Sequence, residues 1–127
     1  MKSLTFCAFA PFALAACSAE STGAYDMTAD AARGKLLSAK FDRGILPGSS
    51  GLKPRVQKSY EGELEWHVLA ADDRNGWWCP LAIESASEGG KKVRVVNQCE
   101  GMLASKNNQQ LDELVDATLS GRAPTFD

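Results

Sequence analysis

The chain has 127 residues, a formal net charge of −2 and a hydrophobic content of 44%, which indicate one globular domain rather than a disordered chain or a polycation. Charges of both signs are mixed after residue 25, with no block of Lys and Arg that could follow a phosphate backbone. Nucleic acid is therefore not an expected partner.

The first residues have the form of an export signal. Lys2 supplies a positive start, and the 13 residues from Leu4 to Ala16 are nearly all apolar or small. A helix needs roughly 20 apolar residues to cross a bilayer, and Pro11 interrupts this stretch, so we expect no permanent transmembrane helix here.

The end of this segment, Leu14-Ala15-Ala16-Cys17, resembles the lipobox of bacterial lipoproteins. The resemblance covers only the first 17 residues. It implies that residues 1–16 are removed as a signal peptide, that the thiol of Cys17 carries diacylglycerol, and that the new amino terminus is usually acylated, for example with palmitate. Two or three acyl chains on one residue anchor a protein stably in a membrane.

The resemblance also bears on location. Ser18 follows the cysteine. In enterobacteria-like systems an Asp at this position tends to retain lipoproteins in the inner membrane, so we expect an exported protein anchored in the outer membrane and facing the periplasm. The alternative is an ordinary secretory signal cut after a small residue between Ala13 and Ala16, which would leave a soluble periplasmic protein.

A tether and a helix are predicted next. Residues 17–25 are expected to be a lipid-anchored flexible tether, because Ser18 to Ala24 are small and polar. Residues 26–127 then form the single mature domain. Thr28 is typical of a helix N-cap and precedes apolar residues at helical spacing, with Gly44 expected to end the helix. Residues 46–51 have the composition of a loop.

From residue 53 to residue 100 apolar and polar residues alternate, which is the pattern of half-buried strands. Four strands are predicted, at residues 55–59, 63–71, 77–85 and 91–100, and Pro54 places the first of them at an edge or strand start. The last two strands are expected to form a hairpin around residues 87–90.

The cysteines provide a test of this hairpin. Cys7 leaves with the signal and Cys17 is used by the lipid, so Cys79 and Cys99 remain as a pair that an exported compartment allows to oxidise. A register that places them opposite each other also pairs Ile83 with Val95 and gathers the apolar residues on one face. A structural disulfide is therefore predicted. Two thiols and one histidine lack zinc-ligand spacing, and neither a metal nor another cofactor is expected.

The face of the preceding strand depends on the length of the turn that follows it. A four-residue turn would place Leu64, Trp66 and Val68 on the cysteine face, and a five-residue turn would place them on the other. We expect four residues, because this unites the apolar sets.

A second helix completes the domain. Asn107 or Asn108 is predicted to cap it, Leu111, Leu114, Val115 and Leu119 form its apolar stripe, and Gly121 ends it. The expected fold class is α+β. The expected order along the chain is a helix, a four-stranded antiparallel sheet and a second helix. Both helices are expected to cover one face of the sheet, which gives a domain of two layers.

The sequence contains few groups with catalytic potential. His67 is the only histidine, and Glu63, Glu65, Asp72 and Asp73 lie near it in sequence, but alternation places it on a solvated strand face. No nucleophile elbow, metalloprotease motif or nucleotide fingerprint is present. We therefore expect that the protein is not an enzyme and has no catalytic residues.

The run Trp77-Trp78-Cys79-Pro80 is the candidate binding feature. Neighbouring strand residues point to opposite faces, so if Trp77 packs with the disulfide, Trp78 stands on the outer face beside Pro80. An exposed tryptophan there is a typical binding anchor. The alternative is that residues 45–52 or the second strand cover it.

Two functional classes follow. The first, which we expect, is a noncatalytic envelope lipoprotein that binds another envelope protein, for example in outer-membrane assembly or maintenance. The second is a lipid-tethered inhibitor or ligand-binding protein, similar in size and cystine content to the small periplasmic inhibitors that protect the wall from lysozyme. An exposed acidic loop would favour the inhibitor and a broad apolar face would favour assembly. Assembly lipoproteins of similar size place both helices before the strands, whereas here one follows them, so residues 25–127 are assigned to no named family.

Overall fold

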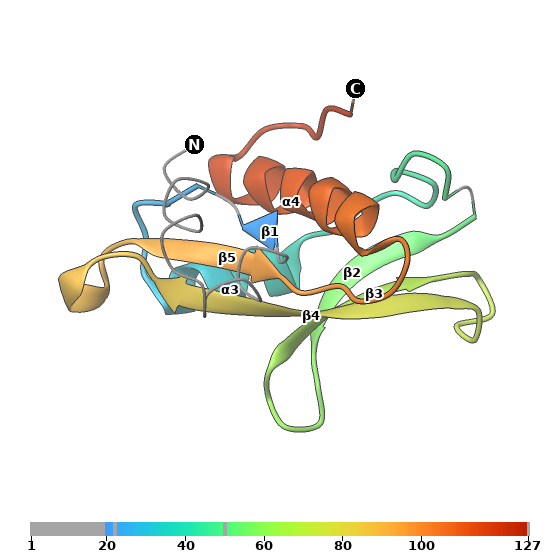
Figure 1. Cartoon of the computed structure of the whole chain (residues 1–127). Coiled ribbons are helices and arrows are strands. Elements are labelled where there is room, and N and C mark those ends of the chain that lie inside the picture. The colour runs from blue at the N-terminus through green and yellow to red at the C-terminus, as the bar shows by residue number, and fades with distance from the viewer. Residues whose placement is uncertain (1–19, 22, 50, 127) are drawn as a thin grey trace.

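The computed structural model describes residues 20–21, 23–49 and 51–126. Its elements are β1 (Glu20–Ser21), α3 (Ala29–Ser38), β2 (Lys53–Lys58), β3 (Leu64–Leu69), β4 (Gly76–Ser85), the 3₁₀ turn η2 (Glu88–Gly90), β5 (Val93–Asn97) and α4 (Ala104–Ser120). The strands form one antiparallel sheet in the order β1-β5-β4-β3-β2 (Figure 1). The predicted signal peptide and Cys17 lie outside the described residues.

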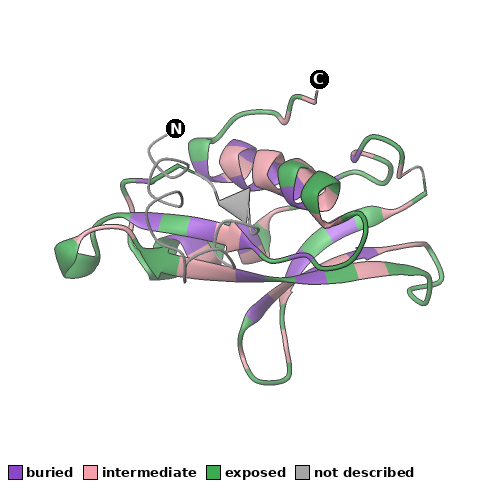
Figure 2. Ribbon diagram, viewed as in Figure 1, coloured by how far each residue is buried: buried purple, intermediate pink, exposed green. Residues whose placement is uncertain are grey.

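The helices form a second layer. Helices α3 and α4 contact each other and cover the same face of the sheet, which confirms the predicted α+β class and its helix, sheet, helix order. Figure 2 shows buried residues gathered between the helical layer and the sheet. The main members of this core are Leu36, Phe41, Leu46, Val56, Leu64, Trp66, Val68, Leu81, Val93, Val95, Leu111, Leu114, Val115 and Leu119.

The sheet has one strand more than the four predicted. Strand β1 lies within residues 17–25, which were expected to be a tether, and its residues Glu20 and Ser21 pair with Asn97 and Val96 of β5. Tyr25 continues this edge, because its backbone exchanges hydrogen bonds of 2.8 and 3.0 Å with Val93. Two residues are too few for alternation to reveal a strand, and β1 is stabilised by the edge of β5 that it covers.

Helix α3 begins as predicted and ends earlier. The side chain of Thr28 accepts a hydrogen bond from the backbone N–H of Ala31 at 3.2 Å. The helix ends at Ser38 rather than near Gly44, because the chain becomes extended at Ala39 and directs Phe41 into the core. The rings of Phe41 and Trp66 lie 5.8 Å apart. Gly44 instead occupies a turn with a φ of 80°, which favours glycine.

The hairpin of β4 and β5 has the predicted register. Ile83 pairs with Val95 and Ser85 pairs with Val93. Cys79 and Cys99 form a disulfide with a Cα–Cα distance of 4.7 Å. Cys99 lies just beyond the end of β5, but the backbone N–H of Gln98 still donates to the carbonyl of Pro80 at 2.9 Å. The pairing therefore continues to the disulfide.

The face predicted for β3 is confirmed, and the expected four-residue turn is found. Leu64 pairs with Leu81 and Trp66 with Cys79, so their side chains share the core face. The strand ladder ends at Leu69 and Gly76, but the backbone N–H of Ala70 still donates to the carbonyl of Asn75 at 2.8 Å, so four residues, 71–74, make the turn. Four is an even number, so the alternation carries across the turn and the apolar sets share one face.

The carboxylate of Asp72 organises this turn. It accepts hydrogen bonds from the backbone N–H groups of Arg74 and Asn75 at 3.0 and 3.2 Å, and from the side chain of Asn75 at 2.7 Å. These bonds favour the charged carboxylate, so the pKa of Asp72 is lowered, first by Arg74 and then by Asn75. Gly76 has a φ of 143° and approaches the backbone of Val68 so closely that a Cβ atom would clash there.

Helix α4 starts before the predicted caps. It begins at Ala104, so Asn107 and Asn108 lie inside it and neither caps it. The side chain of Asn108 points into the core, where its Oδ1 accepts a hydrogen bond from the backbone N–H of Cys99 at 2.9 Å. The predicted apolar stripe is buried, and Gly121 ends the helix in the left-handed conformation.

Candidate functional site

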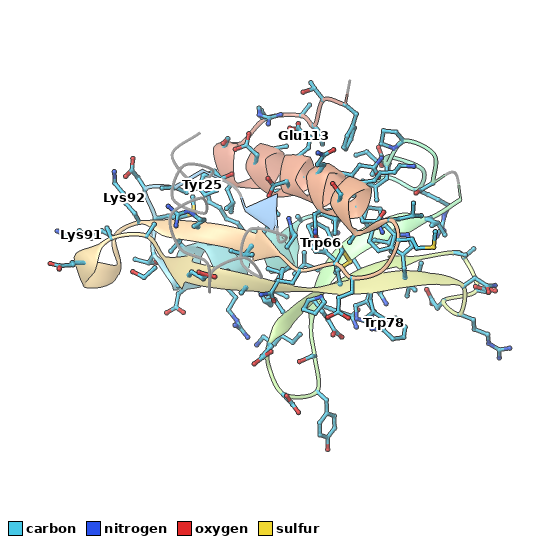
Figure 3. The ribbon with its side chains drawn as sticks, viewed as in Figure 1. Tyr25, Trp66, Trp78, Lys91, Lys92 and Glu113 are labelled. Atoms are coloured by element: carbon cyan, nitrogen blue, oxygen red, sulfur yellow. A yellow bond between two sulfur atoms is a disulfide. The ribbon has the colours of Figure 1, made fainter. Side chains whose placement is uncertain are left out.

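The sheet face opposite the helices carries the predicted binding residues. Strand pairing aligns Arg55, His67 and Trp78 in one row across β2, β3 and β4. The next row aligns Gln57, Glu65 and Pro80. Figure 3 shows Trp78 on the side of the sheet away from α4. We define Glu65, His67, Trp78 and Pro80 as the outer-face patch.

Trp78 is the most prominent side chain of this patch. It is 67% exposed, so neither residues 45–52 nor the second strand cover it. Its indole stacks on the ring of His67, with ring centroids 6.1 Å apart and an interplanar angle of 27°. The Nε2 atom of His67 lies 2.7 Å from Oε1 of Glu65. The histidine is thus held between a carboxylate and the indole, which supports Trp78 from one side while the rest of the indole faces solvent.

The two neighbouring tryptophans occupy different environments, as the alternation predicts. Trp77 pairs with Val68 and packs against the core from the helix side of the sheet, where it is half-buried. Trp78 pairs with His67 on the outer face. Pro80 is also exposed on that face, opposite Glu65. The structure therefore brings the two predicted binding residues, Trp78 and Pro80, onto one exposed surface.

The carboxylates near His67 in sequence are separated in space. Glu65 is the one that contacts the ring, whereas Glu63 lies in the β2–β3 turn and Asp72 in the turn at the other end of β3. Glu63 and Asp72 are exposed, and the hydrogen bonds of Asp72 organise its own turn. In residues 20–21, 23–49 and 51–126, no three His, Cys, Asp or Glu side chains are grouped to hold a metal ion.

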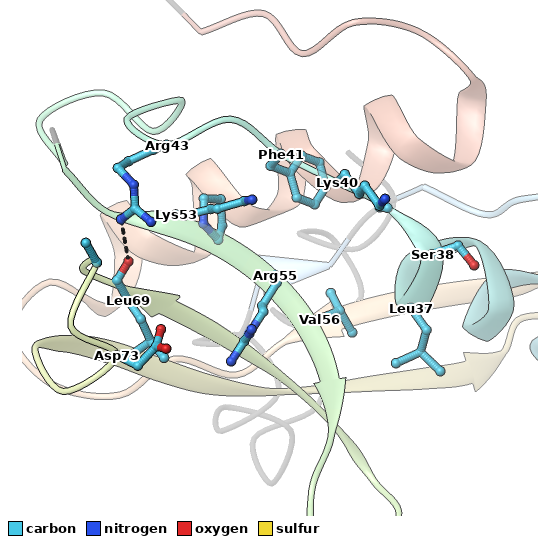
Figure 4. Close-up of a pocket in the computed structure, with 13 residues that line it drawn as sticks. Leu37, Ser38, Lys40, Phe41, Arg43, Lys53, Arg55, Val56, Leu69 and Asp73 are labelled. Atoms are coloured by element: carbon cyan, nitrogen blue, oxygen red, sulfur yellow. Dashed lines mark hydrogen bonds between the residues drawn. The ribbon is translucent and has the colours of Figure 1, made fainter.

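Two further surface features lie outside the predicted binding residues. The first is the exposed β2–β3 turn, which projects from the sheet in Figure 1 and carries Tyr60, fully exposed, with Glu61 and Glu63 beside it. Arg33 of α3 holds this turn through a hydrogen bond to the carbonyl of Gly62. The second is a pocket beside β2 whose rim carries four basic side chains (Figure 4).

A charged cluster ties the C-terminal tail to α4. Arg122 donates to both carboxylate oxygens of Glu113, at 2.6 and 3.0 Å, and also contacts Asp116. Tyr25 donates its hydroxyl to Asp116 at 2.7 Å, and the backbone N–H of Thr125 donates to Glu113 at 2.7 Å. Arg122 and Thr125 lower the pKa of Glu113 to about 2. The cluster therefore connects three parts of the chain: Tyr25 beside β1, helix α4 and the C-terminal tail.

Neither the character of the two helices nor comparison with known proteins assigns a function to this chain. Neither α3 nor α4 combines the length and apolar character needed to cross a bilayer. Comparison with protein-family models, with curated proteins and with solved structures finds no match for this chain.

Proposed function

We propose that this chain is the precursor of a small cell-envelope lipoprotein whose domain binds another envelope protein and catalyses no reaction. The observation that carries the proposal is the exposed indole of Trp78, held in place by His67 on a sheet face that the helices leave open. Tryptophan is enriched among the residues that dominate binding energy, because a large apolar ring buries much area at low entropic cost.

The surroundings of Trp78 suit a protein interface. Pro80 adds rigid apolar surface in the next row, while Glu65 and Arg55 place charges at its border. An apolar centre with a polar rim is the usual composition of a protein-binding patch. The stacking of Trp78 on His67 reduces the freedom that the indole would lose when a partner covers it.

Membrane attachment through Cys17 is part of the proposal and rests on the resemblance to the lipobox. In the proposed mature protein only Ser18 and Ala19 separate the lipidated residue from β1, which begins at Glu20. The domain would then lie close to the membrane surface, with the outer membrane favoured. A partner in or on that membrane fits this position.

The second candidate is a lipid-tethered inhibitor or ligand-binding protein, for example an inhibitor of a wall-degrading enzyme. The projecting turn with Tyr60, Glu61 and Glu63 favours it, because an exposed acidic loop with an aromatic residue complements a basic enzyme. The two candidates therefore place the partner on different surfaces of the domain.

Site-specific crosslinking in cells tests both candidates. The full-length chain carries a photo-crosslinking amino acid in place of Pro80, and captured proteins are identified by mass spectrometry. We expect Trp78→Ala to abolish capture of a specific partner and Tyr60→Ala, a matched exposed aromatic change, to preserve it. Unchanged capture by Trp78→Ala would contradict binding through the outer-face patch. With a crosslinker at Glu61, loss of capture by Tyr60→Ala would support the inhibitor.

Metabolic labelling tests the anchor separately. Wild-type protein in a bacterial envelope should incorporate a labelled fatty acid and sediment with membranes, and Cys17→Ser should remove the label and release the protein or stop its maturation. Cys7→Ser is the matched control, because Cys7 lies within the proposed signal peptide. Unlabelled, membrane-free wild-type protein would contradict the proposed lipidation.

A further inference from the structure

A pocket of about 720 Å³ lies along β2, which is an edge strand of the sheet. Its walls are the end of α3 with the segment that follows it, strand β2, and the residues after β3 (Figure 4). This volume is within the range of small-molecule sites. The pocket is distinct from the outer-face patch, although Arg55 lies beside both.

The charge of this pocket differs from that of the protein. Among the described residues that line it, Lys40, Arg43, Lys53 and Arg55 are basic and Asp73 is acidic. This described lining carries four positive charges and one negative charge, in a chain whose net charge is −2. Within the described part of the chain, Lys40, Lys53 and Arg55 take part in none of the ion pairs, so their charges are available to a ligand.

Arg43 is fixed differently from the other three basic residues. Its Nη1 donates hydrogen bonds to the carbonyl of Gly51 at 2.8 Å and to the carbonyl of Leu69 at 3.4 Å. Figure 4 shows this second bond as a dashed line from Arg43 to Leu69, with Asp73 nearby. The backbone therefore holds this guanidinium in position before any ligand binds, and a preorganised cation loses less entropy on binding an anion.

The pocket also has an apolar part. Phe41 and Val56 are buried at its base, and Leu37 is half-buried beside them. Figure 4 shows Leu37, Val56 and Phe41 on the α3 side of the pocket and Arg43 on the opposite side. A ligand that fills the pocket would therefore meet apolar surface at one end and positive charge along its length.

Strand β2 disfavours a peptide as the occupant. Pro54 has no backbone N–H and lies in the part of β2 that lines the pocket. A proline in an edge strand interrupts the hydrogen-bond ladder that an added strand would need. Lys53 and Arg55 on either side of it also protect the edge. A small ligand fits these features better than an added strand.

We propose that this pocket binds an anionic amphiphile, a phosphate or carboxylate group joined to an apolar chain. The anionic group would lie among Lys53, Arg55 and Arg43, and the chain would contact Phe41, Val56 and Leu37. Such a molecule could be a free amphiphile or the headgroup region of a membrane lipid, because both present the same chemistry. The proposal does not depend on the protein partner inferred for Trp78.

Calorimetric titration of the purified full-length protein with dodecyl phosphate, below its micelle concentration, tests the site. Binding should be at least about tenfold tighter than that of inorganic phosphate, because only the amphiphile buries apolar surface. Lys53→Gln/Arg55→Gln should weaken it by about tenfold or more, since charge-assisted hydrogen bonds are lost. Lys91→Gln/Arg94→Gln removes the same charges from exposed positions outside the pocket and should change the affinity less than about twofold.

Three results would overturn the proposal: no binding of dodecyl phosphate, equal binding of dodecyl phosphate and inorganic phosphate, or equal weakening by the pocket and control variants. Thermal unfolding of both double variants verifies that they fold. Trp78→Ala should leave the affinity unchanged, which separates this site from the outer-face patch.

Vesicles distinguish the two sources of the ligand. Cys17→Ser protein, which lacks the proposed lipid, is sedimented with phosphatidylcholine vesicles with and without phosphatidylglycerol. Sedimentation that requires phosphatidylglycerol, Lys53 and Arg55 would assign the site to a lipid headgroup. Binding of dodecyl phosphate without vesicle binding would assign it to a free amphiphile.

Discussion

The indole Nε1 of Trp66 donates a hydrogen bond of 2.8 Å to Oδ1 of Asn97, and both side chains are fully buried. Trp66 is on β3 and Asn97 on β5, so the bond reaches across β4. The Nδ2 of Asn97 also donates to Asp112 of α4 at 3.4 Å. This interaction connects non-adjacent strands to the helix that covers them.

Asn97→Ala should lower the free energy of unfolding by about 1–3 kcal/mol, because it leaves the buried indole N–H without an acceptor. Trp66→Phe removes the donor, and a double-mutant cycle measured by urea denaturation isolates the coupling. We expect a coupling of about 0.5–3 kcal/mol. A coupling indistinguishable from zero would show that the bond contributes nothing to stability.

The three tryptophans should differ in their contribution to stability according to burial. Trp66→Ala should cost about 3–5 kcal/mol as a core truncation. Trp77→Ala should cost about 1–3 kcal/mol because this side chain is half-buried. Trp78→Ala should stay within about 1 kcal/mol. Chemical denaturation of the three variants provides the comparison, and a large loss for Trp78→Ala would mean that its role is structural.

Removal of the disulfide should destabilise the domain without changing its fold. Cys79→Ala/Cys99→Ala should lower the free energy of unfolding by about 2–4 kcal/mol, because the bond restricts the unfolded chain. Proteolytic mapping of wild-type protein should yield a linked pair of peptides that separates on reduction. Free thiols at both positions in protein taken from a bacterial envelope would contradict this prediction.

Acid should weaken the attachment of the C-terminal tail to α4. The folded-state pKa of Glu113 is lowered to about 2 from an ordinary value of 4.5. Its stabilisation is therefore fully present above about pH 5 and is lost as the pH falls through 4.5 toward 2. Glu113→Gln should cost about 1 kcal/mol or less at neutral pH, since the pair is partly exposed.

The pH dependence distinguishes this ion pair from a packing effect. The difference in urea midpoint between wild type and Glu113→Gln should be constant at neutral pH, shrink as the pH falls below about 4.5 and be largely lost by pH 2. Asp116→Asn provides a comparison, because the pKa of Asp116 is also lowered, first by the hydroxyl of Tyr25 and then by Arg122. A difference that persists unchanged to pH 2 would contradict the proposed role of the Glu113 charge.

The spacing of apolar residues along the sequence was sufficient to predict most of the secondary structure. The period-two alternation and the cysteine pair agree on one register, so the pairing of Ile83 with Val95 could be predicted before any tertiary contact was known. The apolar stripe of α4 and its glycine end were predictable for the same reason. Its start was not, because Asn108 resembles a cap in sequence and instead accepts a buried hydrogen bond from Cys99.

The sequence by itself determined that Trp77 and Trp78 lie on opposite faces, since adjacent strand residues alternate. Only the tertiary structure decided that the face of Trp78 is open, because this depends on both helices packing against the other face. The basic pocket likewise required the fold. Lys40 and Arg43 follow α3, whereas Lys53 and Arg55 belong to β2. A local sequence pattern does not predict that the fold places these two segments around one pocket.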